Sequence, residues 1–324
     1  MRARSRARGW LLVLLCALGA ILPAHAQYPT RPVRLILAFP PGGGTDTLGR
    51  ILSPRMSQGL GQQVVVENRP GGGANIGAEV AAKSPPDGHT MFMVTTAHSV
   101  SATLYTKLGY SLVKDFAAVV LLASTPNLVV VHPSVPVKSI KELIAFTRAR
   151  PGQLDFASSG SGSQPHLAGE LFNSMAGTKM HHIPYKGGGP AVVALVAGEA
   201  AVGFATAPSV VQFVKSGRLR GLAITSLQRS PLLPDLPTVN ESGVSGYEVG
   251  PWYGFLVPTG TPREAIARLN AESLKAMTYP EVKERMAATG LTPLGSTPEA
   301  FGALIRSEVE KWGKVVKATG MRVD

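Results

Sequence analysis

The chain has 324 residues, with 32 Lys and Arg against 20 Asp and Glu, and it contains a single cysteine. That length is enough for two domains, each with its own hydrophobic core. The single cysteine argues against disulfides, thiol catalysis and cysteine-based zinc sites, and the scattered basic residues with 6% aromatics argue against a nucleic-acid-binding surface.

The first 26 residues have the pattern of a secretory signal peptide. Four arginines lie between residues 2 and 8, an apolar run covers residues 10–22, and Ala24-His25-Ala26 has the spacing of a cleavage site. The apolar run is short for a membrane span and ends at Pro23, which disfavours a membrane anchor. We therefore expect export to the periplasm and cleavage after Ala26, which also removes Cys16.

A glycine-rich loop follows the first apolar strand, at residues 33–38. The loop reads Phe39-Pro40-Pro41-Gly42-Gly43-Gly44-Thr45-Asp46 and leads into a helical pattern over residues 46–60. Pro54 lies inside this pattern and should kink the helix or shift its start. Glycines let a backbone approach a ligand closely, and we expect Thr45 and Asp46 to cap the helix. The unpaired N–H groups of a helix N-terminus attract anions, so the loop predicts a pocket for a small carboxylate.

Alternating strands and helices continue to about residue 110. We expect strands at 64–67 and 90–95, and a glycine-rich turn at 68–77 before a helix at 78–83. Residues 96–99 are expected to form a loop at the carboxyl end of the third strand, where ligands of α/β sheets bind. Its His98 could bond a ligand or serve the structure, and the sequence leaves both open.

A second α/β pattern begins after two apolar runs within residues 115–131, separated by a short segment that we interpret as a crossover. Ser139 should cap a helix at 140–149, and the serine-rich loop 158–165 should join a strand at 154–157 to a helix at 166–175. Further strands are expected at 180–184, 201–204 and 221–225, with a helix at 208–216. A strand at 250–258 should then return to the first domain, before helices at 263–277 and 298–319.

This order predicts an α/β fold with two domains, each a mostly parallel sheet flanked by helices, joined by two crossovers as a hinged clamshell. We expect domain I to comprise residues 27–126 and 250–324, and domain II residues 127–249. The loops named above would meet in the cleft between them.

Short motifs spread along the mature chain resemble one known family. They are Tyr28-Pro29-Thr30-Arg31-Pro32-Val33, the glycine loop, Val66-Glu67-Asn68-Arg69-Pro70-Gly71, Pro86-Asp87-Gly88, Ser158-Ser159-Gly160, His166-Leu167-Ala168-Gly169-Glu170, Pro184-Tyr185-Lys186-Gly187 and Pro258-Thr259-Gly260-Thr261-Pro262. The chain is similar to the substrate-binding proteins of tripartite tricarboxylate transporters, the Bug or TctC family. The resemblance implies a type II periplasmic-binding-protein clamshell that binds a small carboxylated solute and delivers it to membrane permease subunits. It implies no cofactor, and we expect a monomer.

In this family a ligand carboxylate is held mainly by backbone amides and bridging waters rather than by a salt bridge. Many members carry Asp or Asn after the strand that ends here at Phe204, whereas this chain has Ala205-Thr206-Ala207. That departure argues against a cationic group at this end of the ligand and leaves the solute open. The resemblance places these residues at the ligand: Phe39, Gly43, Gly44, Thr45, Asp46, Thr96, Ala97, His98, Ser158, Ser159, Gly160, Ser163, Ala205 and Thr206.

Three alternatives to a receptor compete for these residues. A serine hydrolase could use Ser161 with His98 or His166, but no G-x-S-x-G elbow is present. A metal site at His181-His182 is disfavoured because neighbours on a strand point to opposite faces. A sensor that reports to a signalling system cannot be distinguished from a transport receptor by sequence. We therefore predict a binding protein that is not an enzyme, with no catalytic residue and no metal ligand.

Overall fold

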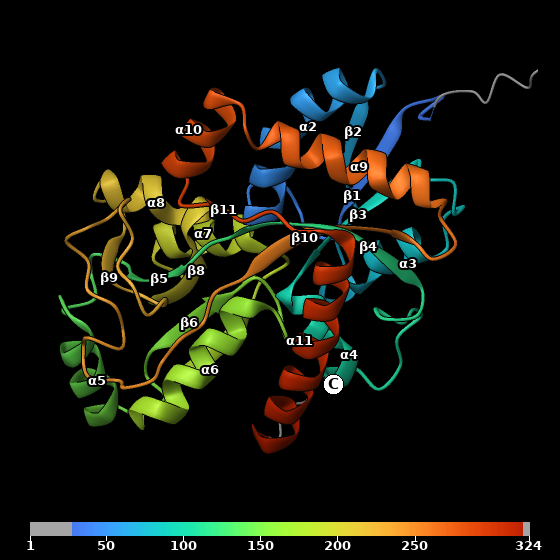
Figure 1. The fold of residues 1–324 in the computed structure, drawn as a ribbon. Coiled ribbons are helices and arrows are strands. Elements are labelled where there is room, and N and C mark those ends of the chain that lie inside the picture. The colour runs from blue at the N-terminus through green and yellow to red at the C-terminus, as the bar shows by residue number, and fades with distance from the viewer. Residues whose placement is uncertain (1–27, 320–324) are drawn as a thin grey trace, which may run out of the picture.

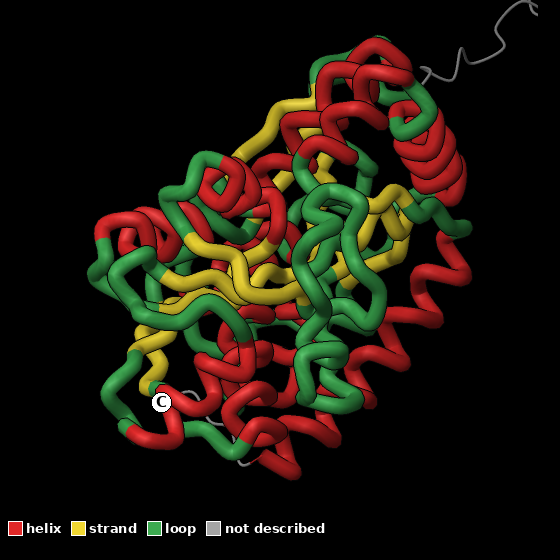
Figure 2. The backbone as a smooth tube through the Cα atoms, turned by 90° about the vertical axis from the view of Figure 1, so that its left-hand side faces the viewer, coloured by secondary structure: helices red, strands yellow, loops and turns green. Residues whose placement is uncertain are grey.

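A computed structural model describes residues 28–319, in which two β-sheets are each flanked by helices (Figure 1). One sheet has six strands in the order β11-β4-β10-β3-β1-β2, and the other has five in the order β7-β6-β8-β5-β9. In the side view the strands lie inside the molecule, with helices and loops around them (Figure 2). This arrangement agrees with the predicted two-domain clamshell.

The six-stranded sheet begins with three parallel strands, β1 (Val33–Leu37), β2 (Val64–Asn68) and β3 (Thr90–Thr95). All side chains of β3 are buried, as expected for a strand covered on both faces. The antiparallel strands β4 (Phe116–Ser124), β10 (Trp252–Pro258) and β11 (Thr292–Pro293) complete it.

Helices cover both faces of this sheet and bury two hydrophobic clusters. The helices are α2 (Gly44–Leu60), α3 (Asn75–Ala82), α4 (Thr96–Leu104), α9 (Arg263–Ala276), α10 (Pro280–Ala288) and α11 (Pro298–Thr319), with a short 3₁₀ turn at Gly72–Ala74. One cluster packs one face of the sheet, through β1, against α2, α9 and α10. The other cluster packs the opposite face of the sheet against α3 and α11. Helix α11 packs along α4, as Figure 1 shows.

The five-stranded sheet contains β5 (Asn127–Val131), β6 (Asp155–Ser158), β7 (His181–Pro184), β8 (Val202–Thr206) and β9 (Arg220–Ile224). Its helices are α5 (Ile140–Ala149), α6 (Gln164–Ala176), α7 (Gly188–Ala197) and α8 (Ala207–Lys215). The Ser139 side chain accepts a hydrogen bond from Glu142 N–H, so the predicted cap of α5 is confirmed. Phe156, Phe172 and Phe204 are central to one of its two cores.

The chain crosses between the sheets twice, and the two crossings are bonded to each other. The first runs from β4 through Thr125 and Pro126 to β5, and the second returns the chain to β10. Thr125 N–H donates to the carbonyl of Pro251, 3.1 Å away. The return of β10 to the first sheet confirms the predicted crossover, while the domain limits at residues 126 and 249 stay a prediction.

Several details differ from the sequence-based expectations. The sheets are mixed rather than mostly parallel, because β5 pairs antiparallel with β8 and β9, and β10 pairs antiparallel with β3 and β4. Helix α2 contains Pro54 and begins at Gly44, two residues before the expected start. Helices α7 and α10 were not predicted: α7 begins with glycines and is then almost wholly apolar, so it shows no helical period, and α10 has only nine residues.

Candidate functional site

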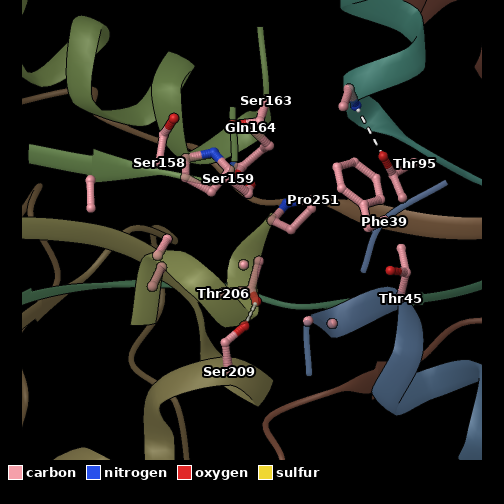
Figure 3. Close-up of a pocket in the computed structure, with 18 of the residues that line it drawn as sticks. Phe39, Thr45, Thr95, Ser158, Ser159, Ser163, Gln164, Thr206, Ser209 and Pro251 are labelled. Atoms are coloured by element: carbon pink, nitrogen blue, oxygen red, sulfur yellow. Dashed lines mark hydrogen bonds between the residues drawn. The ribbon is translucent and has the colours of Figure 1, made fainter. Parts of the chain in front are cut away.

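A pocket of about 620 Å³, part of it open to solvent, lies between the two sheets. In Figure 3, Phe39 and Thr45 come from the part of the chain around the six-stranded sheet. They face Ser158, Ser159 and Gln164, which come from the part around the five-stranded sheet. The pocket is lined by Phe39, Gly43, Gly44, Thr45, Thr95, Ala97, Ala157, Ser158, Ser159, Ser163, Gln164, Pro165, Gly188, Ala191, Leu195, Ala205, Thr206, Ser209, Pro251 and Tyr253.

Five helices begin at this pocket. The capping or first residues that line it are Gly43 of α2, Thr95 of α4, Ser163 of α6, Gly188 of α7 and Thr206 of α8. Only α4 among them has its N-terminus capped by a side chain, since Thr95 accepts from Ala97 N–H, and α2, α6, α7 and α8 have no such cap. Uncapped N-termini present N–H donors and the positive ends of helix dipoles, which favour an anion.

No charged side chain lines the pocket as far as residues 28–319 are concerned. The attraction for an anion therefore comes from backbone N–H groups and hydroxyls rather than from a salt bridge. The sequence had predicted this character, because the three loops expected at the site contain neither Lys nor Arg.

The structure brings ten of the fourteen predicted residues to the pocket and places four elsewhere. Asp46, Thr96, His98 and Gly160 do not line it. Asp46 is the third residue of α2 and not its N-cap, which is Gly43. Thr96 accepts a hydrogen bond from Trp252 N–H (3.1 Å), so it fastens α4 to β10. That the ten lining residues contact a ligand remains a prediction.

Asp46 shapes the glycine loop from behind. Its carboxylate accepts from Gly42 N–H (3.2 Å), from Asn68 Nδ2 (3.2 Å) and from Arg50 Nε (2.9 Å). Asn68 Nδ2 also donates to the Phe39 carbonyl (3.0 Å). Because the Arg50 guanidinium pairs with it, the buried carboxylate does not oppose an anion on the other side of the loop.

The serine loop is shaped by Ser158 and Gly160. Ser158 Oγ lies 2.6 Å from His182 Nε2 and accepts from Gly160 N–H (3.1 Å). Gly160 has φ +126°, a conformation that other residues rarely adopt, and its carbonyl accepts from Ser163 N–H (3.0 Å). Gly160 therefore serves the loop's shape, while Ser158, Ser159 and Ser163 line the pocket.

His98 supports the structure and does not reach the pocket. Residues 96–98 form the first turn of α4 instead of the expected loop, because Thr95 and His98 make a reciprocal capping box. The ring is fully buried, its Nδ1 accepts from Thr95 N–H (3.0 Å), and it packs edge-on against Phe92. Burial lowers the pKa of His98 to about 4.

The buried neutral His98 should make folding stability fall in acid. Its folded pKa lies below its unfolded value, so the unfolded chain binds a proton first and stability is lost as pH falls from about 6.5 toward 4. Comparing urea unfolding at pH 7.5, 5.5 and 4.5, we expect His98→Gln to flatten the pH slope by up to about 1.4 kcal/mol per pH unit. His132→Gln is the matched control, and equal slopes in His98→Gln and the parent chain would contradict this role.

The remaining wall contains residues that the sequence did not indicate. Tyr253 lines the pocket, and its buried hydroxyl bonds Thr206, whose Oγ1 lies 2.5 Å from Ser209 Oγ. Burial raises the pKa of Tyr253 above its ordinary value. The wall also contains Ser209 of α8 and Ala191 and Leu195 of α7. Whether these helices reach the pocket depends on how the five-stranded sheet is arranged, so no local sequence pattern indicates these residues.

Glycine loops from the two sides meet at the edge of the pocket. A Cβ on Gly189 would lie 2.7 Å from the Pro41 carbonyl oxygen, and one on Gly188 would lie 3.5 Å from Gly43 Cα. Gly187, with φ +126°, likewise has no room for a Cβ beside the Pro40 ring. The backbones of the α2 and α7 N-termini are therefore in contact, and the cleft is closed at this point.

Among residues 28–319, no group of three or more His, Cys, Asp or Glu is placed so that it could hold a metal ion. His182 stacks on His166 with ring centres 3.9 Å apart, and it contacts Ser158. Burial lowers the pKa of His182 to about 3 and that of His166 to about 4, so both rings are neutral at pH 7. Ser161, the nucleophile of the hydrolase alternative, does not line the pocket.

The comparison with protein families decides the classification. The model of the "Tripartite tricarboxylate transporter family receptor" matches residues 48–321. The chain belongs to this receptor family. Its members are solute-binding receptors.

Three solved structures of similar proteins agree with this classification. The periplasmic binding protein BugD is 33% identical with a TM-score of 0.88, covering 91% of this chain and 99% of its own. An R. palustris protein solved with adipate is 36% identical with a TM-score of 0.87, covering 90% and 98%. MatC from Rhodopseudomonas palustris, with bound malate, is 31% identical with a TM-score of 0.85, covering 89% and 100%. Proteins of this receptor family act in the periplasm, which places the chain there.

Proposed function

We propose that this protein is a periplasmic receptor that binds a small carboxylate in the pocket between its two sheets. The observation that carries the proposal is the meeting of four uncapped helix N-termini in a pocket without a charged side chain. The adipate and malate complexes of the two similar proteins support it. The residues proposed to contact the carboxylate are the ten predicted ones that line the pocket.

Closure of the cleft around the solute would produce the form that the permease subunits of a tripartite transporter recognise. We expect a monomer, with an affinity of about 1 μM or tighter. We propose no catalytic activity, because His182 beside Ser158 is held neutral by a pKa of about 3 and is a weak base. Hydrolysis of carboxylic esters that stops on Ser158→Ala would overturn this part.

Export depends on the leader, whose residues 1–26 lie outside the part of the chain that the structure describes. Within residues 28–319, no helix has the length and apolar character needed to cross a membrane. We propose cleavage after Ala26. The intact mass of the protein recovered from a periplasmic fraction checks the site, and a chain that still begins at Met1 would contradict it.

The receptor proposal is tested by native mass spectrometry of the purified mature chain and a thermal-shift screen of carboxylic acids. Each acid is paired with its methyl ester, which has the same shape without the charge. We expect at least one acid to stabilise the protein, by about 2.7 kcal/mol at a hundredfold excess over its Kd, and its ester to have little effect. Equal stabilisation by acid and ester, or none by any acid, would contradict a carboxylate receptor.

A further inference from the structure

One leucine of α6 is buried among helices that belong to the other sheet. Leu167 lies on the first turn of α6 and packs into an apolar socket on α4 and α11 (Figure 1). The socket consists of Val100, Leu104, Trp312 and Val316. Within residues 28–319, Leu167 is the only buried member of this cluster from the part of the chain around the five-stranded sheet, and it belongs to neither core of that sheet. Its burial therefore stabilises the contact between the two parts of the molecule rather than either part alone.

The carboxylate of Glu308 fixes the socket relative to the second crossover. Glu308 Oε2 accepts from Trp312 Nε1 (2.9 Å) and from Trp252 Nε1 (3.1 Å). Trp252 is the first residue of β10, where the chain returns to the six-stranded sheet, and its N–H donates to Thr96 of α4 (3.1 Å). All these residues belong to the part of the chain around the six-stranded sheet, so we expect the socket to keep its shape whether or not Leu167 occupies it.

Leu167 is also tied to the wall of the ligand pocket. Its N–H donates to the carbonyl of Ser163 (3.1 Å), and residues 163–165 line the pocket. The serine loop before them rests on the end of α4, because a Cβ on Gly162 would overlap Leu104 Cδ2. A movement that draws this wall of the pocket away from α4 would therefore withdraw Leu167 from the socket.

We propose that Leu167 and the α4–α11 socket form a latch that is made only when the cleft is closed, and that this latch raises the affinity for the solute from outside the ligand pocket. The proposal rests on the hinged receptor proposed above and adds a residue that controls its closure. Because the Leu167 side chain leaves water only on closing, its burial favours the closed form, in which the helix N-termini of both sheets reach the solute together.

Isothermal titration calorimetry with adipate, malate and the acid that ranks first in the thermal-shift screen tests the latch. Leu167→Ala should weaken binding by at least about tenfold, because the closed form loses most of the area buried in the socket. Urea unfolding of the ligand-free variant should change little, since Leu167 then lies outside the socket and belongs to no core of its own sheet. Leu171→Ala is the matched control: it lies one turn further along α6, packs against a core of the five-stranded sheet, and should lower the ligand-free stability without changing the affinity.

A change on the other side of the contact should act in the same way. Leu104→Ala, at the end of α4 and outside the pocket, should also weaken binding. The double variant Leu104→Ala/Leu167→Ala should lose less affinity than the product of the two single losses, because both substitutions remove the same contact.

Double electron–electron resonance measures closure directly. A chain that begins at Gln27 has no cysteine, so Lys141→Cys on α5 and Lys275→Cys on α9, both exposed, place one spin label on each part of the molecule. We expect the acid to shift the distance distribution of the parent chain. At the same acid concentration, Leu167→Ala should keep a larger fraction at the ligand-free distance.

The possible results separate this inference from the receptor proposal. Unchanged affinity in Leu167→Ala, while the parent chain binds and closes, overturns the latch and leaves the receptor standing. Ligand-free stability that falls as far in Leu167→Ala as in Leu171→Ala also overturns the latch, because the contact would then be permanent. A parent chain that binds no acid overturns both proposals. Weaker, non-additive binding in Leu167→Ala and Leu104→Ala, with full affinity in Leu171→Ala, supports the latch.

Discussion

Gly44→Ala should weaken carboxylate binding by about 100-fold, equivalent to about 2.7 kcal/mol. The new Cβ would lie 2.3 Å from Tyr253 Oη and 3.4 Å from Thr206 Oγ1, so it would displace the tyrosine into the pocket or push the α2 N-terminus back. Gly44 does not have a positive φ, so the alanine causes no backbone strain of its own. Isothermal titration with the acid found by the thermal-shift screen measures the loss.

Tyr253→Phe should restore part of that affinity when it is combined with Gly44→Ala, because it removes the oxygen that clashes. Gly302→Ala in α11 is the matched control, since its Cβ would meet only ordinary contacts at 3.6 Å or more. Unchanged binding in Gly44→Ala would move the anion site away from the α2 N-terminus. A double variant as weak as the single one would show that the Tyr253 hydroxyl is not the obstacle.

Gly189→Ala should hold the cleft open and weaken binding by at least about tenfold. Its Cβ would lie 2.7 Å from the Pro41 carbonyl oxygen, and both groups are backbone-fixed, so the contact between α2 and α7 cannot form. Alanine suits a helix better than glycine, so the ligand-free protein should be as stable as the parent chain. The variant therefore separates closure from folding.

Small-angle X-ray scattering with and without the acid measures closure. We expect the radius of gyration of the parent chain to decrease at saturating ligand and that of Gly189→Ala to change less. Parent dimensions that do not change with ligand would contradict a hinged receptor. Full affinity in Gly189→Ala would show that the glycine contact is not required for the bound state.

The order of strands and helices along the chain could largely be predicted from sequence. The meeting of several helix N-termini at one pocket could not. The strand–glycine–helix pattern around Gly44 and the serine loop around Ser158 are local signals, and the structure brings both to one pocket. The α7 N-terminus was not predicted because the helix begins with Gly188 and Gly189 and is then almost wholly apolar, so it shows no helical period. Its approach to Gly43 depends on the relative position of two sheets, which no local pattern specifies.

Some of the polar residues in the expected motifs have side chains that bond the backbone and do not line the pocket. Asp46, Thr96 and His98 occur in the expected motifs, yet each bonds backbone groups beneath the pocket. Gln164 was not predicted because a glutamine after a serine loop has no special spacing, and its place in the pocket wall and its bond to Asn127 become evident only in the fold. In both cases the direction of a side chain, which sequence does not give, decides its role.

A neutral pocket suits a receptor that must later release its solute. Backbone N–H groups hold a carboxylate without placing a permanent charge in the cleft, so the ligand-free site carries no unpaired buried ion. Four helix N-termini distributed over both sheets also make the full set of donors available only when the cleft is closed. We therefore expect binding and closure to be coupled.

The position of the carboxylate in a crystal structure of the complex with the most stabilising acid tests the central claim most directly. We predict carboxylate oxygens at about 2.7–3.2 Å from backbone N–H groups at the N-termini of α2 and the helices that face it. We also predict that no Lys or Arg side chain lies within hydrogen-bonding distance of them. A carboxylate paired with a lysine or arginine, or bound outside the pocket between the sheets, would contradict the account.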